Sequence, residues 1–370
     1  MKNKLFVKLT LIITLSILII PALIVFIVDP IQLYHDQISL KKEKFFQQQR
    51  HQNIGLINKF LKRSDEKYNN IIMGTSMSEN FRPSKFEKAL NNNEKVLKLT
   101  MSGGRPLEQY TLIEKALETG KVKKVFWDLH TYYLYSKISQ KDKNHDFPYK
   151  LYSDNLFTQG LFYLFNRDYV KNSIDVYKGK VNWGKWTENL DKLNFWEDKD
   201  IKRKIFRKYH SEKNLKKLND KILNREVSFD EFWQKNYNYS NIEKYVINVI
   251  KKYPDVEFNI YFPPYSTWFY RTVKYQDLGR FLYVRKFMAE KSSQLQNLKV
   301  FGFDNEYDIV NNIYNYKDYG HFRSYINDFI MENMINDRNQ LNLANVESYL
   351  KNMIDNINNY DEIYFKEIKK

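Results

Sequence analysis

Three residue types that together perform acyl-transfer chemistry stand at separate points of the chain. Asp318 precedes His321 by three residues, a spacing that lets the carboxylate orient the imidazole while the other ring nitrogen reaches a serine hydroxyl. Ser76 follows Gly74 and Thr75 after an apolar run. We expect Ser76 to open a helix, whose positive end would favour negative charge on its oxygen. These residues predict a nucleophile, Ser76, a general base, His321, and an orienting acid, Asp318.

Acyl transfer also requires hydrogen-bond donors for the oxyanion that forms on the substrate. Gly103 and Gly104 permit a tight turn after the second apolar run, so the amide of either glycine, together with that of Ser76, is a predicted donor. Asp128 ends the third run, and when ionised it cannot donate. His130 follows two residues later and is the alternative third donor. For Asp128 and His130 a structural role, capping the strand or bonding the adjacent loop, is the competing prediction.

Further residues near these positions are candidates for substrate contact. Arg82 follows the loop that contains Ser76, and Arg105 follows the loop that contains Gly103 and Gly104. Each is predicted either to bind an anionic substrate or to be a solvated surface arginine. Tyr265 leaves the fourth apolar run and is predicted to shape one wall of the cleft. Five tryptophans have two possible roles: they form a platform on which sugar rings pack, or they pack in the core. These are Trp183, Trp186, Trp196, Trp233 and Trp268.

A parallel sheet is the element that could bring these residues together. Short apolar runs that resemble buried strands alternate with helical patterns at 106–118, 242–252 and 276–294. This order predicts an α/β fold with a five-stranded doubly wound parallel sheet. Ligands of such sheets bind beyond the carboxyl ends of the strands, where the candidate residues would converge. The predicted strands are 70–73, 96–100, 124–129, 256–262 and 298–303.

The N-terminus predicts a membrane anchor. Three lysines within the first eight residues precede an uncharged, mostly apolar run from Leu9 to Val28, long enough to cross a hydrocarbon core of about 30 Å. The positive-inside rule then keeps the N-terminus cytoplasmic and exports the chain beyond the apolar run. A cleaved signal peptide is the rival interpretation, but its apolar region is usually only about 7–15 residues long and ends in small residues. We therefore expect a single-pass protein of the cell membrane with an extracytoplasmic domain.

The same patterns divide the chain into segments. An insertion interrupts the α/β domain, because several helical patches there show no strand order. The predicted segments are a cytoplasmic stub and transmembrane anchor at 1–30, a helical stalk or packing helix at 31–67, the α/β domain at 68–336 with its insertion at 132–239, and a C-terminal helical tail at 337–370.

Composition narrows the classes of partner. The formal net charge of +16 favours an anionic neighbour, and cell-wall polymers or lipid headgroups suit an exported domain better than nucleic acid. A bias towards Lys, Asn, Ile, Tyr and Phe explains the charge equally well. No basic helix or zinc-type spacing predicts nucleic-acid binding. The chain has 0 Cys, which agrees with an exported domain without disulfides and is also compatible with a cytosolic one.

Gly74-Thr75-Ser76, the glycine turn and Asp318-x-x-His321 together resemble the SGNH (GDSL-type) hydrolase superfamily. The segment 74–84, GTSMSENFRPS, after a membrane anchor resembles its anchored branch. That branch includes proteins of alginate O-acetylation and the D-alanyl transfer protein of teichoic-acid modification. The resemblance covers about 68–130 and 240–335 and implies the flavodoxin-like SGNH fold. One departure is that the superfamily supplies an Asn after the third strand, where this chain has Asp128 and His130. Either His130 substitutes, or the oxyanion hole has two donors.

The resemblance implies a serine-dependent O-acyltransferase or carboxyl-ester hydrolase that modifies a cell-surface polysaccharide. It also implies a membrane-bound O-acyltransferase as the partner that supplies the acyl group. No metal or cofactor is expected, because the acid–base machinery requires none. The alternative is a non-catalytic accessory protein that binds cell-wall polymer or the membrane acyltransferase through the same fold. A purely structural protein would not need Ser76, Asp318 and His321 at matching strand ends.

Overall fold

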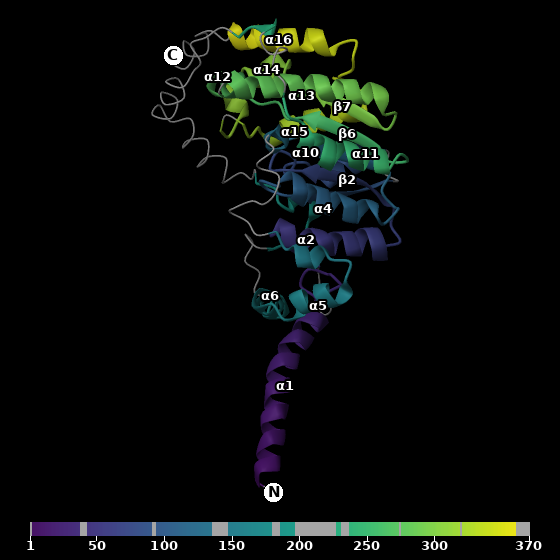
Figure 1. The fold of residues 1–370 in the computed structure, drawn as a ribbon, viewed down its shortest axis with the longest axis vertical. Coiled ribbons are helices and arrows are strands. Elements are labelled where there is room, and N and C mark those ends of the chain that lie inside the picture. The colour runs from purple at the N-terminus through teal and green to yellow at the C-terminus, as the bar shows by residue number, and fades with distance from the viewer. Residues whose placement is uncertain are drawn as a thin grey trace.

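The chain is described by a computed structural model at residues 2–37, 43–90, 94–134, 147–179, 186–196, 227–230, 237–273, 275–318 and 320–359. One apolar helix, α1 (Lys2–Val28), projects from an α/β body (Figure 1). Within the described residues, α1 is the one helix that is long and apolar enough to cross a membrane. Beyond Lys8 its exposed side chains are almost entirely apolar, which suits the hydrocarbon core of a bilayer.

The centre of the body is a five-stranded sheet whose neighbouring strands are all parallel. The strand order is β3-β2-β4-β6-β7, which numbered by position along the chain is 2-1-3-4-5. In β2 the consecutive residues Ile71, Ile72 and Met73 are all fully buried. Successive side chains point to opposite faces, so both faces of the sheet are covered. The predicted parallel sheet is confirmed, with strands at β2 (Tyr68–Gly74), β3 (Lys95–Thr100), β4 (Lys124–Asp128), β6 (Glu257–Phe262) and β7 (Leu298–Gly302).

Helices connect and cover these strands. α4 (Pro106–Leu117) illustrates the local causes. Pro106 opens it, and the Glu108 carboxylate accepts the amide hydrogen of the N-cap residue Arg105 at 3.1 Å. The remaining elements are α2 (Gln49–Leu56), the π-helical η1 (Ile57–Arg63), α3 (Pro83–Ala89), α10 (Ser240–Ile242), η6 (Glu243–Ile247), α11 (Asn248–Lys252), α12 (Thr267–Thr272), α13 (Tyr275–Gln294), α14 (Tyr307–Val310), η7 (Ile313–Asn315), α15 (Ser324–Ile335) and α16 (Val346–Asn358).

The segment predicted as a stalk or packing helix lies against the domain. Ile54, Leu56 and Ile57 are buried, and α2 contacts both β3 and α4. A two-stranded antiparallel sheet of β1 (Phe45–Phe46) and β5 (Trp186–Thr187) ties this segment to the insertion. The hydrophobic core therefore includes residues from well before the α/β domain.

The described parts of the insertion are mainly helical. They comprise η2 (Thr131–Leu134), η4 (Tyr149–Tyr152), α5 (Leu156–Leu164), α6 (Arg167–Tyr177) and η5 (Leu190–Lys192). Figure 1 shows α5 and α6 beside the end of α1 that meets the body, with α16 at the opposite end of the molecule. Residues 135–146, 180–185, 197–226 and 231–236 of the predicted insertion lie outside the described residues, as does 360–370 of the predicted tail.

Candidate active site

The structure brings Ser76, His321 and Asp318 together beyond the carboxyl ends of the strands. Ser76 Oγ lies 2.8 Å from His321 Nε2, within hydrogen-bonding distance. His321 Nδ1 lies 2.9 Å from one carboxylate oxygen of Asp318. The other oxygen of Asp318 accepts the amide hydrogens of His321 at 2.8 Å and Gly320 at 2.9 Å. The three residues have the arrangement of a nucleophile, a base and an orienting acid.

Asp318 is held in its ionised form. Burial raises the pKa of this carboxyl, but the hydrogen bond and charge of His321 and the amides of His321 and Gly320 outweigh burial and lower it to about 2. An ionised carboxylate only accepts hydrogen bonds, so Nδ1 of His321 carries the ring hydrogen. Nε2 is then the nitrogen that accepts the hydroxyl hydrogen of Ser76.

Ser76 does not open a helix, so that expectation is wrong. It stands in a run of tight turns, in which the Ser78 amide donates to the Thr75 carbonyl at 3.0 Å and the Phe81 amide to the Ser78 carbonyl at 3.2 Å. The following helix, α3, begins only at Pro83. The side chains of Thr75 and Ser78 are hydrogen-bonded beneath the turn, and such bonds compete with helix formation. No helix dipole therefore acts on the Ser76 oxygen.

Asp128 holds this turn from below. Its Oδ2 accepts hydrogen bonds from the Thr75 amide at 2.9 Å, the Thr75 hydroxyl at 3.0 Å and the Ser78 hydroxyl at 3.0 Å. Burial, aided by the charge of Glu79, outweighs these bonds and raises the pKa of Asp128 to about 7. Asp128 thus bonds the adjacent loop, the structural alternative that its sequence position left open.

The close approach of Asp128 explains the glycine before the turn. Gly74 has φ +139°, and a Cβ at this position would lie 2.5 Å from Cγ of Asp128. A side chain at residue 74 would collide with the carboxylate and strain the backbone. The packing beneath Ser76 therefore requires glycine at position 74.

Two further side chains fix the same turn by binding its carbonyl groups. Lys98 Nζ donates to the carbonyls of Glu79 and Phe81, both at 2.9 Å, and burial lowers the pKa of Lys98 to about 7. Asn327 donates to the carbonyl of Met77 at 2.9 Å. Ser76 consequently projects from a rigid loop, which favours a fixed nucleophile geometry.

Of the two glycines predicted to supply an oxyanion donor, one is already engaged. The amide of Gly104 donates to the carbonyl of Met101 at 2.9 Å, so it is used in the turn itself. Gly103 adopts φ +60° at that turn. Within the described part of the chain, the amides of Gly103 and Ser76 have no hydrogen-bond acceptor. These two amides are the backbone donors that remain for an oxyanion.

His130 and Tyr265 lie near His321. Burial, with the positive charges of His321 and Arg105 nearby, lowers the pKa of His130 to about 3, so its ring is neutral near pH 7. The rings of His130 and Tyr265 meet edge to face at 6.3 Å. The Tyr265 ring also packs against Gly320, where a Cβ would lie 3.5 Å from it. Tyr265 is buried and supports the loop that carries His321.

The two predicted substrate-binding arginines are engaged within the protein. Arg82 pairs with Asp328 at 2.5 Å, and Lys85 pairs with the same carboxylate at 2.5 Å. Arg105 stands at the N-cap of α4, and its charge acts on His130. Arg82 therefore shares one acidic partner with Lys85, whereas Arg105 contributes positive potential near the site.

Trp196 contacts both Ser76 and His321, which distinguishes it from the other aromatic residues in a way that the sequence did not. Its indole Nε1 donates to the carbonyl of Ser76 at 3.1 Å, and its ring meets that of His321 edge to face at 5.9 Å. Lys317 Nζ lies 4.7 Å from the centre of the Trp196 ring, a cation–π distance. Among the other tryptophans predicted as a sugar platform, Trp186 and Trp268 are buried. Trp183 and Trp233 lie outside the described residues.

Sequence reasoning also missed a link between the Ser76 loop and the turn that contains Gly103. The side chain of Gln49 accepts a hydrogen bond from the Ser102 amide and donates one to Glu79. Burial raises the pKa of Glu79. The hydrogen bond from Gln49 and the positive charges of His321, Lys98 and Lys317 act in the opposite direction but are outweighed. Gln49 comes from α2, so no local pattern could have indicated its role. It fixes the residue that precedes Gly103 relative to the Ser76 loop.

No group of three or more His, Asp or Glu side chains is placed to hold a metal ion in the described ranges. A scan against protein-family models found no match to this chain, and a search of curated proteins also found none. The functional interpretation therefore depends on the geometry of the site.

Proposed function

We propose that this protein is a membrane-anchored, serine-dependent acyl-transfer enzyme of the SGNH type. The observation that carries the proposal is the hydrogen-bonded series from Ser76 through His321 to Asp318. The 2-1-3-4-5 strand order agrees with a flavodoxin-like sheet, whose ligands bind at the strand ends next to the point where the order reverses. Ser76 follows β2 at that point.

The reaction proceeds through an acyl-enzyme. Ser76 Oγ attacks the carbonyl carbon of an ester while His321 Nε2 takes the hydroxyl proton. The amides of Ser76 and Gly103 bind the resulting oxyanion, with the neutral His130 ring as the third donor. The intermediate collapses when the C–O bond to the leaving alcohol breaks and His321 protonates that alcohol. A sugar hydroxyl or water then attacks the acyl-serine while His321 takes its proton. The bond between the acyl carbon and Ser76 Oγ breaks, and His321 returns the proton to Ser76.

The surroundings of Ser76 favour a carbohydrate acceptor. Trp196 offers an aromatic surface against which a sugar ring can pack, and Lys317 beside it suits an anionic polymer. With α1 in the membrane and its N-terminus in the cytoplasm, the site faces the cell surface. The proposed substrate is a cell-surface polysaccharide or anionic cell-wall polymer, and a membrane-bound O-acyltransferase is the proposed source of acyl groups. The anchor favours transfer over release into water, since a tethered enzyme reaches membrane-linked donors and acceptors.

A serine-selective test uses the full chain in detergent micelles. Wild type should release nitrophenol from p-nitrophenyl acetate and react with a fluorophosphonate at Ser76, as located by mass spectrometry. Ser76→Ala should lose both reactions, whereas Ser293→Ala, at an exposed serine of α13, should retain them. In cells, Ser76→Ala should also lower the acyl content of the surface polysaccharide.

The opposite result identifies the non-catalytic alternative. If wild type and Ser76→Ala are equally unreactive and support equal acylation of the polymer in cells, the enzyme assignment is wrong. The protein would then act as an accessory that binds polymer or the membrane acyltransferase.

A further inference from the structure

The helix α5 has its polarity reversed relative to a helix on the surface of a soluble protein. Its buried side carries Gln159 and Tyr163, both with polar groups. Gln159 donates to the Leu151 carbonyl at 2.6 Å. The outward side is apolar, whereas a helix facing water normally presents polar residues there. The exposed fractions are 76% for Leu156, 74% for Phe157, 46% for Leu161 and 49% for Phe165.

This apolar surface lies beside the end of the membrane helix. Both α5 and α6 contact α1, and Figure 1 shows the pair at the point where α1 enters the body. Asp29, immediately after α1, accepts a hydrogen bond from the Tyr163 hydroxyl at 2.7 Å. It also accepts the amide hydrogens of Leu33 at 2.9 Å and Tyr34 at 2.7 Å. These bonds fix the direction of α1 relative to α5.

The next helix adds the basic residues that accompany membrane-surface helices. Arg167, Lys171 and Lys178 are exposed along α6 and its C-terminal end, and one acidic residue, Asp168, is exposed with them. Ile174 and Tyr177 are exposed between them, at 37% and 72%. Basic residues interspersed with exposed apolar ones are typical of a helix that lies in the plane of an interface with anionic lipid.

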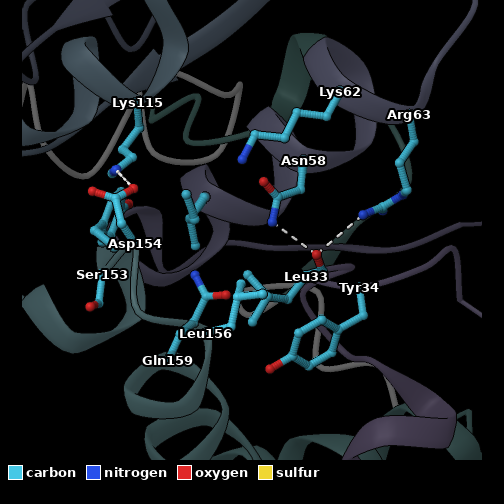
Figure 2. A pocket seen from close by; sticks show the side chains of 12 residues that line it. Leu33, Tyr34, Asn58, Lys62, Arg63, Lys115, Ser153, Asp154, Leu156 and Gln159 are labelled. Atoms are coloured by element: carbon cyan, nitrogen blue, oxygen red, sulfur yellow. Dashed lines mark hydrogen bonds and ion pairs between the residues drawn. The ribbon is translucent and has the colours of Figure 1, made fainter. Parts of the chain in front are cut away.

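A pocket of about 320 Å³ opens at the edge of the same surface. Leu156 and Tyr34 line one side of it, and Lys62 and Arg63 line the other (Figure 2). Arg63 is bonded to the Leu33 carbonyl at 3.2 Å, whereas the Lys62 ammonium group points towards the middle of the pocket (Figure 2). The pocket thus holds the Lys62 cation together with Leu156, and Lys115 and Asp154 also line it. Charged and apolar groups side by side suit the level of the lipid headgroups.

We propose that the apolar surface of α5, formed by Leu156, Phe157, Leu161 and Phe165, is embedded in the bilayer leaflet nearest the body. The basic residues of α6 and Lys62 then lie among lipid phosphates. A lipid surface is the occupant because α1, packed against α5, already places this end of the molecule at a membrane. The insertion is thereby a second membrane attachment that sets the height and tilt of the catalytic domain. This proposal depends on α1 spanning a bilayer and not on acyl-transfer activity.

Depth-dependent fluorescence quenching tests the proposal on the full chain. The protein has 0 Cys, so single cysteines accept a fluorophore without competition. Phe157→Cys and Leu161→Cys report on the apolar surface. Leu343→Cys is the matched control, because Leu343 is also an exposed leucine, at 56%, in the segment before α16 at the far end of the body. Each labelled protein is reconstituted in vesicles of phosphatidylcholine and phosphatidylglycerol.

Lipids with brominated acyl chains should quench the labels at 157 and 161 but not at 343. Aqueous iodide should give the reverse order, with several-fold weaker quenching at 157 and 161. A label at Lys178→Cys should be quenched by a headgroup nitroxide more than by brominated chains. Equal iodide quenching at 157, 161 and 343 would overturn the proposal. Protection of 157 and 161 from both quenchers would overturn it as well, since a protein would then cover the surface.

Discussion

Ser76 Oγ and His321 Nε2 lie 2.8 Å apart although 245 residues separate them in the chain. Ser76 follows β2, whereas His321 follows β7 at the edge of the sheet, with β4 and β6 between them. The loop after β7 must therefore reach back across two strand ends. Its path is fixed in part by Tyr316, whose hydroxyl donates to the Pro264 carbonyl beyond β6 at 2.9 Å. The distance between Ser76 and His321 consequently depends on contacts made by other residues of these loops.

The first prediction concerns the orienting acid. Asp318→Asn should keep the fold but lower kcat/KM for p-nitrophenyl acetate by about 10⁴-fold, the loss seen when a triad acid becomes an amide. The reason is that an amide nitrogen can donate to Nδ1 and favour the tautomer with hydrogen on Nε2. The measurement is steady-state hydrolysis beside circular dichroism. A rate within threefold of wild type would show that Asp318 does not orient His321.

The second prediction concerns Gly74. Gly74→Ala should destabilise the protein by more than about 2 kcal/mol, because the new Cβ would collide with Asp128 and the backbone conformation is unfavourable. Gly120→Ala is the matched control, since Gly120 also has positive φ, +69°, but has nothing within 4 Å of the added carbon. Its cost should be about 1 kcal/mol.

Urea unfolding of both variants measures the difference. Gly74→Ala should also lose esterase activity under conditions where it remains folded, because the Ser76 turn moves with residue 74. Equal destabilisation of the two variants would mean that Asp128 does not confine this position.

The third prediction uses the raised pKa of Asp128, about 7 against an ordinary 3.8. Between pH 3.8 and pH 7 the Asp128 carboxyl keeps its proton in the folded protein but has lost it in the unfolded chain. The contribution of this carboxyl to the free energy of unfolding is therefore fully present below pH 3.8 and is lost as the pH rises through 7. Each unit of pKa difference corresponds to about 1.36 kcal/mol, so the free energy of unfolding falls by as much as about 4 kcal/mol. The stability of wild type relative to Asp128→Asn should therefore fall between about pH 4 and pH 7.

Denaturant unfolding of both proteins across this range provides the measurement. Asp318, whose pKa is lowered, contributes the opposite slope at lower pH, but it is present in both proteins and cancels in the difference. A stability difference that is constant with pH would show that Asp128 has an ordinary pKa.

Features that depend on neighbouring residues in the chain were predictable from the sequence, whereas features that depend on contacts between distant segments were not. The five strands are short runs rich in apolar residues, so their positions and their parallel arrangement were predictable from burial on both faces. The convergence of Ser76 and His321 was predictable from the rule that strand ends share one edge of the sheet. The same rule could not say which glycine amide stays free, because that depends on the Gly104–Met101 bond.

Other features depend on contacts between distant segments. The helix expected at Ser76 is absent because Asp128, from another strand, binds Thr75 and Ser78. Trp196 was one aromatic residue among many, and only its bond to the Ser76 carbonyl distinguishes it from Trp186, which is buried in the core. Gln49 lies before the predicted domain altogether. Local patterns do not encode such long-range pairs.

The last prediction separates the chemical step from recognition of the acceptor. Trp196→Phe keeps an aromatic surface near His321 but removes the indole donor to the Ser76 carbonyl, seen at 3.1 Å. Trp196→Ala removes both. A neutral hydrogen bond contributes about 0.5–1.5 kcal/mol, so Trp196→Phe should lower kcat with p-nitrophenyl acetate by no more than about tenfold.

Polysaccharide acceptors should respond differently, because ring stacking requires the aromatic face. Trp196→Ala should raise the KM for an oligosaccharide acceptor much more than Trp196→Phe does, while the two variants differ less with the small ester. Lys317→Ala removes the adjacent charge. It should weaken the binding of anionic acceptors in a salt-dependent way and leave the binding of neutral acceptors nearly unchanged. If Trp196→Ala affects the small ester and the oligosaccharide equally, Trp196 supports the Ser76 turn and does not contact the acceptor.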